Sequence, residues 1–232
     1  MRPDSVCFDL DDTLYPYAEY ARTGLRAAGD RLTARTGRRL TDELLELYFD
    51  DGVTTGTFDR LVERYDDVPP SVVSELVAAY HDAEAPIEPY EATVPVLRAL
   101  RDEYRLGLVT DGRNGGGKLR RLGLADGYFG AVVVAPEHDT SKHHPEPFEE
   151  ALGSLSVDPE QTVYVGDDPR VDFAVPNRLG MGTVRLRRGR YADLDAPEPR
   201  AAPDAEIESL DELPAVLGSA GSVLDAGRQG EA

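Results

Sequence analysis

Ser5-Val6-Cys7-Phe8-Asp9-Leu10-Asp11-Asp12-Thr13-Leu14 joins a short, mostly apolar segment to three carboxylates. The first part is typical of a buried strand, and the acids follow where that strand would end. Open α/β sheets bind their ligands at the carboxyl ends of the strands, so acids at this position are expected to face a ligand. A solvated turn is the alternative interpretation, and a single Asp-Asp pair in so acidic a chain would fit it.

A second acidic turn weakens that alternative. The segment Gly166-Asp167-Asp168-Pro169-Arg170-Val171-Asp172 again follows a strand-like run, Thr162-Val163-Tyr164-Val165. Two acidic turns on one sheet edge would repel each other unless a divalent cation lay between them. Mg²⁺ fits because it binds a few carboxylates, keeps several waters and engages a substrate phosphate. The two turns together predict a Mg²⁺ site.

From about residue 92 onward, short β-branched segments alternate with helical patterns. This alternation is typical of an α/β fold, and we expect a Rossmann-like parallel sheet core with crossover helices. The expected strands are 5–8, 105–109, 131–134, 162–165 and 183–186. The expected helices of this part are 94–100, 118–122, 148–155 and 171–179.

The interval 15–89 differs, because it shows helical periodicity throughout and no convincing strand. We interpret it as an all-helical insertion, with helices expected at 18–36, 42–49, 58–65 and 71–81. The insertion separates the first strand from the second, so the catalytic core is expected to comprise residues 1–14 and 90–217. Residues 218–232 are rich in Gly, Ser and Ala, which predicts a disordered tail.

Four motifs occur in order: Asp9-Leu10-Asp11-Asp12-Thr13, Thr110 at a strand end, Lys142 before a helix, and Gly166-Asp167 through Asp172. Because these motifs occur in this order, the sequence resembles the haloacid dehalogenase superfamily, and the resemblance extends over nearly the whole chain. A lone Asp-x-Asp is a weak signal, whereas four motifs on four successive loops are specific. The insertion 15–89 is similar to the helical cap of one branch of the family, which implies a lid that excludes water and selects substrate.

The resemblance implies a role for each acidic motif residue. Asp9 would attack phosphorus to form an aspartyl-phosphate, and Asp11 would protonate the leaving oxygen and then activate water. The implied cofactor is Mg²⁺, held by the Asp9 carboxylate, the Asp11 backbone carbonyl and Asp167. Asp172 would act behind these ligands or through a water, and would orient Lys142.

The phosphate would be bound by the Thr110 hydroxyl, the backbone amides of Asp111 and Gly112, and the Lys142 ammonium. Lys118 and Lys142 are the only lysines in a chain that otherwise uses arginine. This favours a specific role for Lys142 over a surface lysine. Lys118 follows a glycine-rich segment, and we expect it at a flexible helix start where Lys118→Arg is nearly silent.

Two positions depart from the family pattern. Asp111 stands where relatives often have Asn, which puts a carboxylate near the phosphate unless its side chain turns away. His143 follows Lys142 where relatives usually have Pro. We interpret His143 and His144 as polar loop residues, because neighbours on a chain rarely converge on one metal ion.

The expected function is Mg²⁺-dependent hydrolysis of a small phosphate ester of the nucleotide, triose phosphate or phosphoglycolate type. Dehalogenating relatives lack a carboxylate at the position of Asp11, so its presence favours phosphate chemistry. A phosphomutase would use the same residues and stays an alternative. The non-enzymatic alternative is a catalytically inactive regulatory or binding module, against which the complete motif set argues.

The composition limits the partners. The chain has 25 basic and 44 acidic residues and a formal charge of -19, which disfavours nucleic acid and anionic membranes. Such acidity with so few lysines indicates a halophilic protein together with GC-rich coding. No segment approaches the ~20 apolar residues of a membrane span, and no apolar leader follows Met1, so we expect a cytoplasmic protein. The sequence carries no sign of an oligomeric state.

Overall fold

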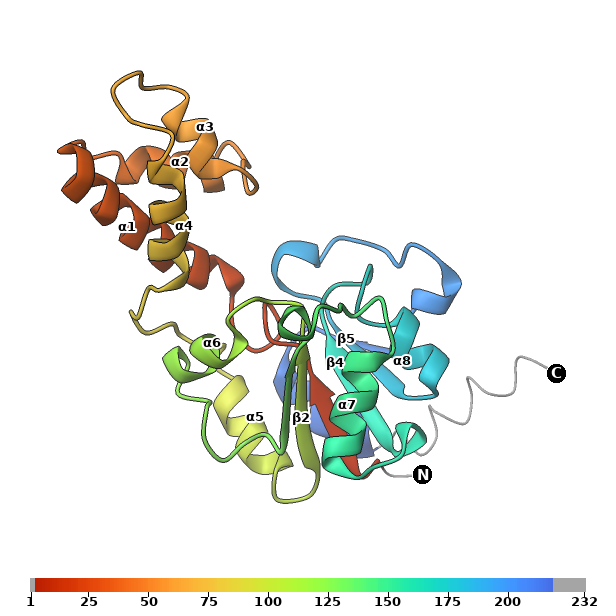
Figure 1. The fold of residues 1–232 in the computed structure, drawn as a ribbon. Coiled ribbons are helices and arrows are strands. Elements are labelled where there is room, and N and C mark those ends of the chain that lie inside the picture. Colours follow the sequence, from red (N-terminus) through yellow and green to blue (C-terminus); the bar gives the residue numbers. More distant parts are fainter. Residues whose placement is uncertain (1–2, 219–232) are drawn as a thin grey trace. The chain divides into compact units, whose positions relative to one another are not determined.

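The computed structural model describes residues 3–218 (Figure 1). Within them, six strands form one fully parallel sheet in the order β3-β2-β1-β4-β5-β6. This confirms the predicted parallel α/β core. The strands are β1 Ser5–Phe8, β2 Arg105–Thr110, β3 Ala131–Val134, β4 Thr162–Gly166, β5 Gly182–Leu186 and β6 Ala205–Ile207.

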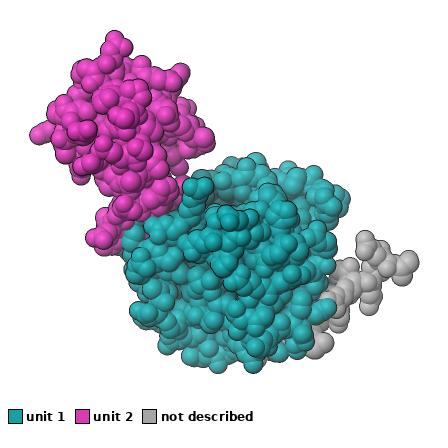
Figure 2. All heavy atoms as spheres, in the orientation of Figure 1, with its two compact units in different colours: residues 1–16, 88–232 teal, residues 17–87 magenta. Residues whose placement is uncertain are grey.

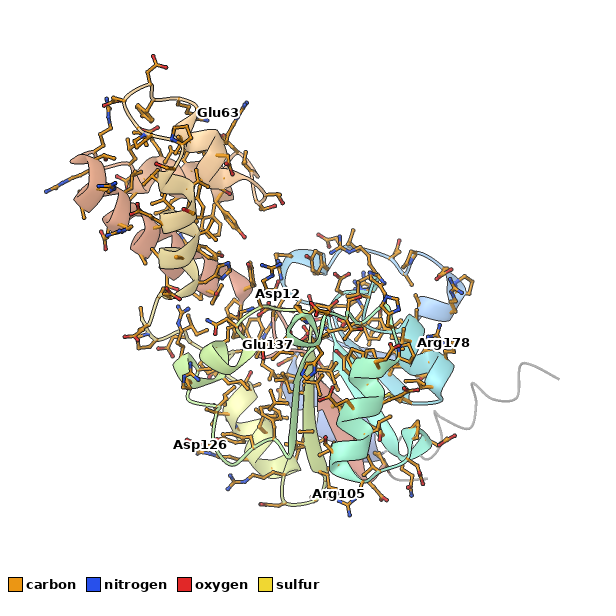
Figure 3. The ribbon with its side chains drawn as sticks, in the orientation of Figure 1. Asp12, Glu63, Arg105, Asp126, Glu137 and Arg178 are labelled. Carbon is orange, nitrogen blue, oxygen red and sulfur yellow. The ribbon has the colours of Figure 1, made fainter. Side chains whose placement is uncertain are left out.

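The first strand lies at the centre of the sheet. Phe8 pairs with Leu108 of β2 on one side and with Val165 of β4 on the other. Because parallel strands end at one edge, the loops after these three strands come together there. Figure 3 shows Asp12 at this end of the core and Arg105, the first residue of β2, at the opposite end.

Helix α7 contacts β2 and β3 and lies in front of the sheet in Figure 1. Between the two lies an apolar cluster that includes Val109, Val133, Phe148 and Leu152. The helices of this part are α5 Thr93–Leu100, α6 Gly115–Arg121, α7 Glu146–Leu155 and α8 Ala174–Leu179. Its 3-10 turns are η1 Ala135–His138, η2 Pro159–Gln161, η3 Gly189–Tyr191, η4 Pro199–Ala201 and η5 Leu210–Glu212.

Four elements differ most from the sequence expectation. Helix α3 Thr57–Val62 ends three residues before the expected position, because the chain continues in turns such as that closed by the Arg64 N–H and the Leu61 carbonyl. Strand β6 was missed because it is only three residues long and lies at the sheet edge. Helix α6 begins earlier than expected, at Gly115, because the Lys118 N–H already donates to the Asn114 carbonyl at 2.9 Å. Helix α8 begins later than expected, because Asp172 donates its N–H to Asp168 and closes a turn before the helix.

The chain divides into two compact units (Figure 2). Unit 1 contains the described residues up to Pro16 and from Glu88 onward, and unit 2 is Tyr17–Ile87. Every element that the structure describes in unit 2 is helical, namely α1 Tyr17–Thr36, α2 Thr41–Phe49, α3 Thr57–Val62 and α4 Val72–His81. Helix α1 packs against α4 and α2 and buries the stripe Leu25, Ala28 and Leu32.

Two further expectations concern the C-terminal tail and membrane-spanning helices. Gly218, where the predicted tail begins, is helical and is the last described residue, and 219–232 lie outside the described residues. Among residues 3–218, no helix combines the length and apolar character needed to cross a membrane.

Candidate active site

Asp9 is the first residue after β1, and its side chain is buried. Its N–H donates to the Val165 carbonyl of β4 at 2.8 Å, which fixes its backbone at the centre of the sheet edge. Its Oδ1 accepts a hydrogen bond from Lys142 Nζ at 2.5 Å. Thr13 Oγ1 lies 3.5 Å from Asp9 Oδ2 and donates to Asp167 Oδ1 at 3.2 Å, so one hydroxyl joins the two acidic turns.

Asp172 holds Lys142 and the second acidic turn together. Its Oδ1 accepts from Lys142 Nζ at 2.7 Å, and its Oδ2 accepts from the backbone amides of Asp167 at 3.0 Å and Asp168 at 2.8 Å. This approach requires glycine at position 166, where a Cβ would come within 2.4 Å of Asp172 Oδ2. Asp172 therefore connects Lys142 to the second acidic turn, and its role in orienting the lysine stays a prediction.

If all three were ionised, the buried acids would carry more negative charge than the single ammonium of Lys142 offsets. Carboxylate oxygens of Asp9, Asp167 and Asp172 lie within 4.8 Å of one another. Burial, with the charges of Asp172 and Asp9, raises the pKa of Asp167. Burial also raises the pKa of Asp9, an effect that Lys142 opposes and Asp172 and Asp11 reinforce. Burial opposes the charge on Lys142, yet Asp172 and Asp9 raise its pKa well above the ordinary value, so the ammonium stays charged.

This donor set fits a divalent cation. Asp167 Oδ2 is buried and has no hydrogen-bond partner among the described residues, a costly condition for a carboxylate oxygen. With all three acids ionised and one ammonium present, the excess is two negative charges. A cation that accepts carboxylate oxygens would satisfy both the charge and the open oxygen, as Mg²⁺ does.

Thr110 is the last residue of β2, and the loop that follows it brings Asp111 into contact with Lys142. Thr110 is buried, and its Oγ1 accepts from the Gly112 N–H at 3.0 Å. Asp111 Oδ1 accepts from the Lys142 backbone N–H at 2.9 Å. The side chain at 111 therefore connects the lysine loop to the loop after β2, and an asparagine Oδ1 could accept the same hydrogen bond.

Asp11 is held by residues that the sequence did not single out as partners. Lys118 Nζ donates to Asp11 Oδ1 at 2.8 Å and to Oδ2 at 2.6 Å, and the Tyr15 hydroxyl donates to Oδ1 at 2.5 Å. The expectation of a tolerant, flexible Lys118 is wrong, because its side chain is only 2% exposed and forms this ion pair. The Asp11 carboxylate is not among the clustered acids at the candidate metal site. The backbone carbonyl of Asp11 is therefore the group of this residue that could bind the metal ion.

Sequence reasoning also missed an ion pair between the buried Asp12 and the exposed Arg190. Asp12 is buried with a left-handed backbone (φ 60°), and Arg190 Nε donates to its Oδ2. Arg190 lies far from Asp12 in the sequence, so no local sequence pattern predicts this ion pair. His143 and His144 are exposed and lie outside the acidic cluster, in line with their interpretation as loop residues.

Comparison with known proteins agrees with this geometry. The family profile described as haloacid dehalogenase-like hydrolase matches residues 3–180. The chain belongs to this family. A relative named glyceraldehyde 3-phosphate phosphatase, from Methanopyrus kandleri, is 38% identical over 221 residues, which cover 90% of this chain and 94% of the relative. This haloacid dehalogenase-like chain is accordingly a hydrolase.

Solved structures of the family share the fold. A phosphatase of this superfamily from Thermococcus onnurineus has a TM-score of 0.64 at 28% identity and covers 93% of this chain and 98% of its own. A 2-haloacid dehalogenase from Pseudomonas syringae pv. Tomato DC3000 has a TM-score of 0.66 at 29% identity, with the same coverage. The fold thus spans two chemistries within the haloacid dehalogenase-like family, and the site residues must distinguish them.

Proposed function

We propose that the protein is a Mg²⁺-dependent phosphatase that hydrolyses a small phosphate ester of the triose phosphate type through phosphorylated Asp9. The observation that carries this proposal is the Asp9 carboxylate, buried at the end of β1 and 2.5 Å from Lys142 Nζ. The relative named glyceraldehyde 3-phosphate phosphatase supports the triose phosphate class over the nucleotide and phosphoglycolate classes. The carboxylate at Asp11 supports phosphate chemistry over dehalogenation.

In the first step, an oxygen of Asp9 attacks phosphorus, and the bond from phosphorus to the ester oxygen breaks. The departing oxygen takes a proton from Asp11, so the alcohol leaves neutral. Lys142 stabilises the negative charge that the transferring group and Asp9 share, and Thr110 donates to a phosphoryl oxygen.

In the second step, Asp11 accepts a proton from water, and that water's oxygen attacks phosphorus. The bond between Asp9 and phosphorus breaks, which releases inorganic phosphate and restores the Asp9 carboxylate. The proton taken from that water restores the acid form of Asp11, and the cycle closes. Asp172 keeps Lys142 aimed at Asp9 through both steps, supported by its 2.7 Å contact with Nζ.

Asp9, Asp167 and the Asp11 backbone carbonyl would hold Mg²⁺, with Asp172 behind them. When bound, the ion would neutralise phosphate charge and align it for displacement. The buried, unpartnered Asp167 Oδ2 supports this assignment.

We assign substrate selection to the helical residues 15–89. All the motif residues named above belong to unit 1, so unit 2 is the part left to recognise the rest of the substrate. We also place the enzyme in a salt-rich cytoplasm, supported by its charge of -19 and its two lysines.

The test is a phosphate-release assay of the purified protein with glyceraldehyde 3-phosphate, a nucleoside monophosphate and phosphoglycolate. We expect Mg²⁺-dependent release with the highest kcat/KM for the triose phosphate, lost in Asp9→Asn and retained in the control Asp126→Asn, which changes an exposed acid. Isomerisation of a sugar phosphate without release would support a phosphomutase instead. Inactivity on the whole panel would support a binding module and overturn the proposal.

A further inference from the structure

The ion pair between Lys118 and Asp11 joins helix α6 to the loop after β1. Asp11 follows β1, whereas Lys118 lies in α6 after β2. Both oxygens of Asp11 accept from Lys118 Nζ, at 2.8 and 2.6 Å, and Tyr15 adds a third hydrogen bond to Oδ1. These three bonds fix the direction of the carboxylate as well as its position.

The space around this pair is too tight for a larger cation. A Cβ at position 112 would come within 2.4 Å of Asp11 Oδ2 and 2.7 Å of Lys118 Nζ. The backbone of Gly112 therefore passes directly beside the ion pair. A compact ammonium fits there, whereas the planar fork of arginine needs more room. This explains why a chain with arginine at almost every basic position keeps lysine at 118.

Stability alone is a poor reason for such a pair. Burying an ammonium costs desolvation energy, and apolar residues of similar volume often stabilise a protein as well or better. A buried pair is better explained when one partner has chemistry to perform. Asp11 is the residue to which the proposed function gives the proton transfers, and its carboxylate is what Lys118 holds.

We infer that Lys118, assisted by Tyr15, is a positioning residue that aims the Asp11 carboxyl group for proton transfer to the leaving oxygen and from the attacking water. The inference rests on the proposed function, because it takes Asp11 as the acid and base of that reaction. It adds that α6, which carries none of the four motifs, supplies a side chain on which catalysis depends. Lys118 acts through Asp11, so its loss should affect only the steps in which Asp11 moves a proton.

The experiment compares Lys118→Met and Tyr15→Phe with Arg120→Gln, a control that removes a positive charge from the exposed side of the same helix. Each variant is assayed with glyceraldehyde 3-phosphate and with p-nitrophenyl phosphate. The alkoxide of the first must be protonated as it leaves, whereas nitrophenolate leaves readily without a proton. The ratio of the two kcat/KM values therefore reports on the acid.

We expect Lys118→Met to lower kcat/KM for glyceraldehyde 3-phosphate about 10- to 100-fold, and for p-nitrophenyl phosphate much less. Inhibition by inorganic phosphate should stay unchanged. Tyr15→Phe should also lower kcat/KM more for glyceraldehyde 3-phosphate than for p-nitrophenyl phosphate, with a smaller loss. Because it removes only one hydroxyl, this variant tests the inference if Lys118→Met does not fold. Arg120→Gln should match the wild type.

A second comparison places Lys118→Met in an Asp11→Asn background. If Lys118 acts through Asp11, the double variant should be no slower than Asp11→Asn alone. Three results would overturn the inference: equal losses with both substrates, a further loss in the Asp11→Asn background, or a gain of activity in Lys118→Met. Inactivity of the wild type on both substrates would instead refute the proposed function, so the two failures are distinguishable.

Discussion

Lys142→Arg keeps a positive charge at the centre of the site and changes only its shape. Lys142 is 3% exposed, and its Nζ lies 2.5 Å from Asp9 Oδ1 and 2.7 Å from Asp172 Oδ1. An ammonium reaches both oxygens as a point charge, whereas a guanidinium presents a planar fork that needs more volume. The larger head can be accommodated only if Asp9 or Asp172 moves.

The losses of stability and of activity that this movement would cause can be estimated. Adding atoms to a packed interior typically costs ~1–3 kcal/mol, and each kcal/mol lowers the melting temperature of a chain this size by about 2–4 °C. We therefore expect a loss of roughly 2–12 °C. A displacement of about 1 Å at a catalytic group can cost about 10²-fold in rate, so kcat should fall about 10²-fold or more. KM should change little, because the charge that attracts phosphate is kept.

The assay is kcat and KM for glyceraldehyde 3-phosphate, measured beside the melting temperature. Arg120→Lys is the matched control, since it exchanges the same two residue types at an exposed position of α6. It should leave both activity and stability unchanged. Full activity in Lys142→Arg would contradict this prediction, because it would show that the contacts with Asp9 and Asp172 do not require an ammonium.

Three further predictions follow from the acidic cluster and the surface charge. Mg²⁺ should raise the melting temperature of the wild type, by an amount that grows with ln(1 + [Mg²⁺]/Kd). Asp167→Asn should abolish most of that rise, and an equal rise in both proteins would contradict Asp167 as a Mg²⁺ ligand. Gly166→Ala should lower kcat about 10-fold or more, because its Cβ would come within 2.4 Å of Asp172 Oδ2, and unchanged kinetics would show that the turn adapts freely. The melting temperature should rise from low to molar KCl, because salt screens repulsion within a chain of charge -19; a flat or falling series would leave coding bias as the reason for the composition.

The acids at the ends of β1 and β4 were predictable from the sequence, because position at a strand end is itself a local feature. Apolar runs marked the strands, and a parallel sheet brings their carboxyl ends to one edge. The structure accordingly places carboxylate oxygens of Asp9, Asp167 and Asp172 within 4.8 Å of one another. Strand β6, in contrast, is held at the sheet edge by pairing with β5 and carries no apolar run of its own.

Lys118 was mistaken for a tolerant residue because its glycine-rich neighbours suggested flexibility. The scarcity of lysine, which favoured a specific role for Lys142, applied equally to Lys118 and was the available signal. The partner could not be predicted, because Asp11 is 107 positions away in sequence and the two meet only through the pairing of β1 with β2. The contact of Asp111 with the Lys142 amide depends on tertiary structure in the same way.

Asp9 is expected to become phosphorylated during turnover. Wild-type protein should be mixed with glyceraldehyde 3-phosphate and Mg²⁺, quenched in acid within the first turnovers, digested and examined by mass spectrometry. Reduction of the acyl phosphate with borohydride would mark the modified residue permanently. We predict the mark on Asp9 in the wild type and none in Asp9→Asn. Phosphate on any other residue, or turnover by Asp9→Asn at the wild-type rate, would contradict the mechanism.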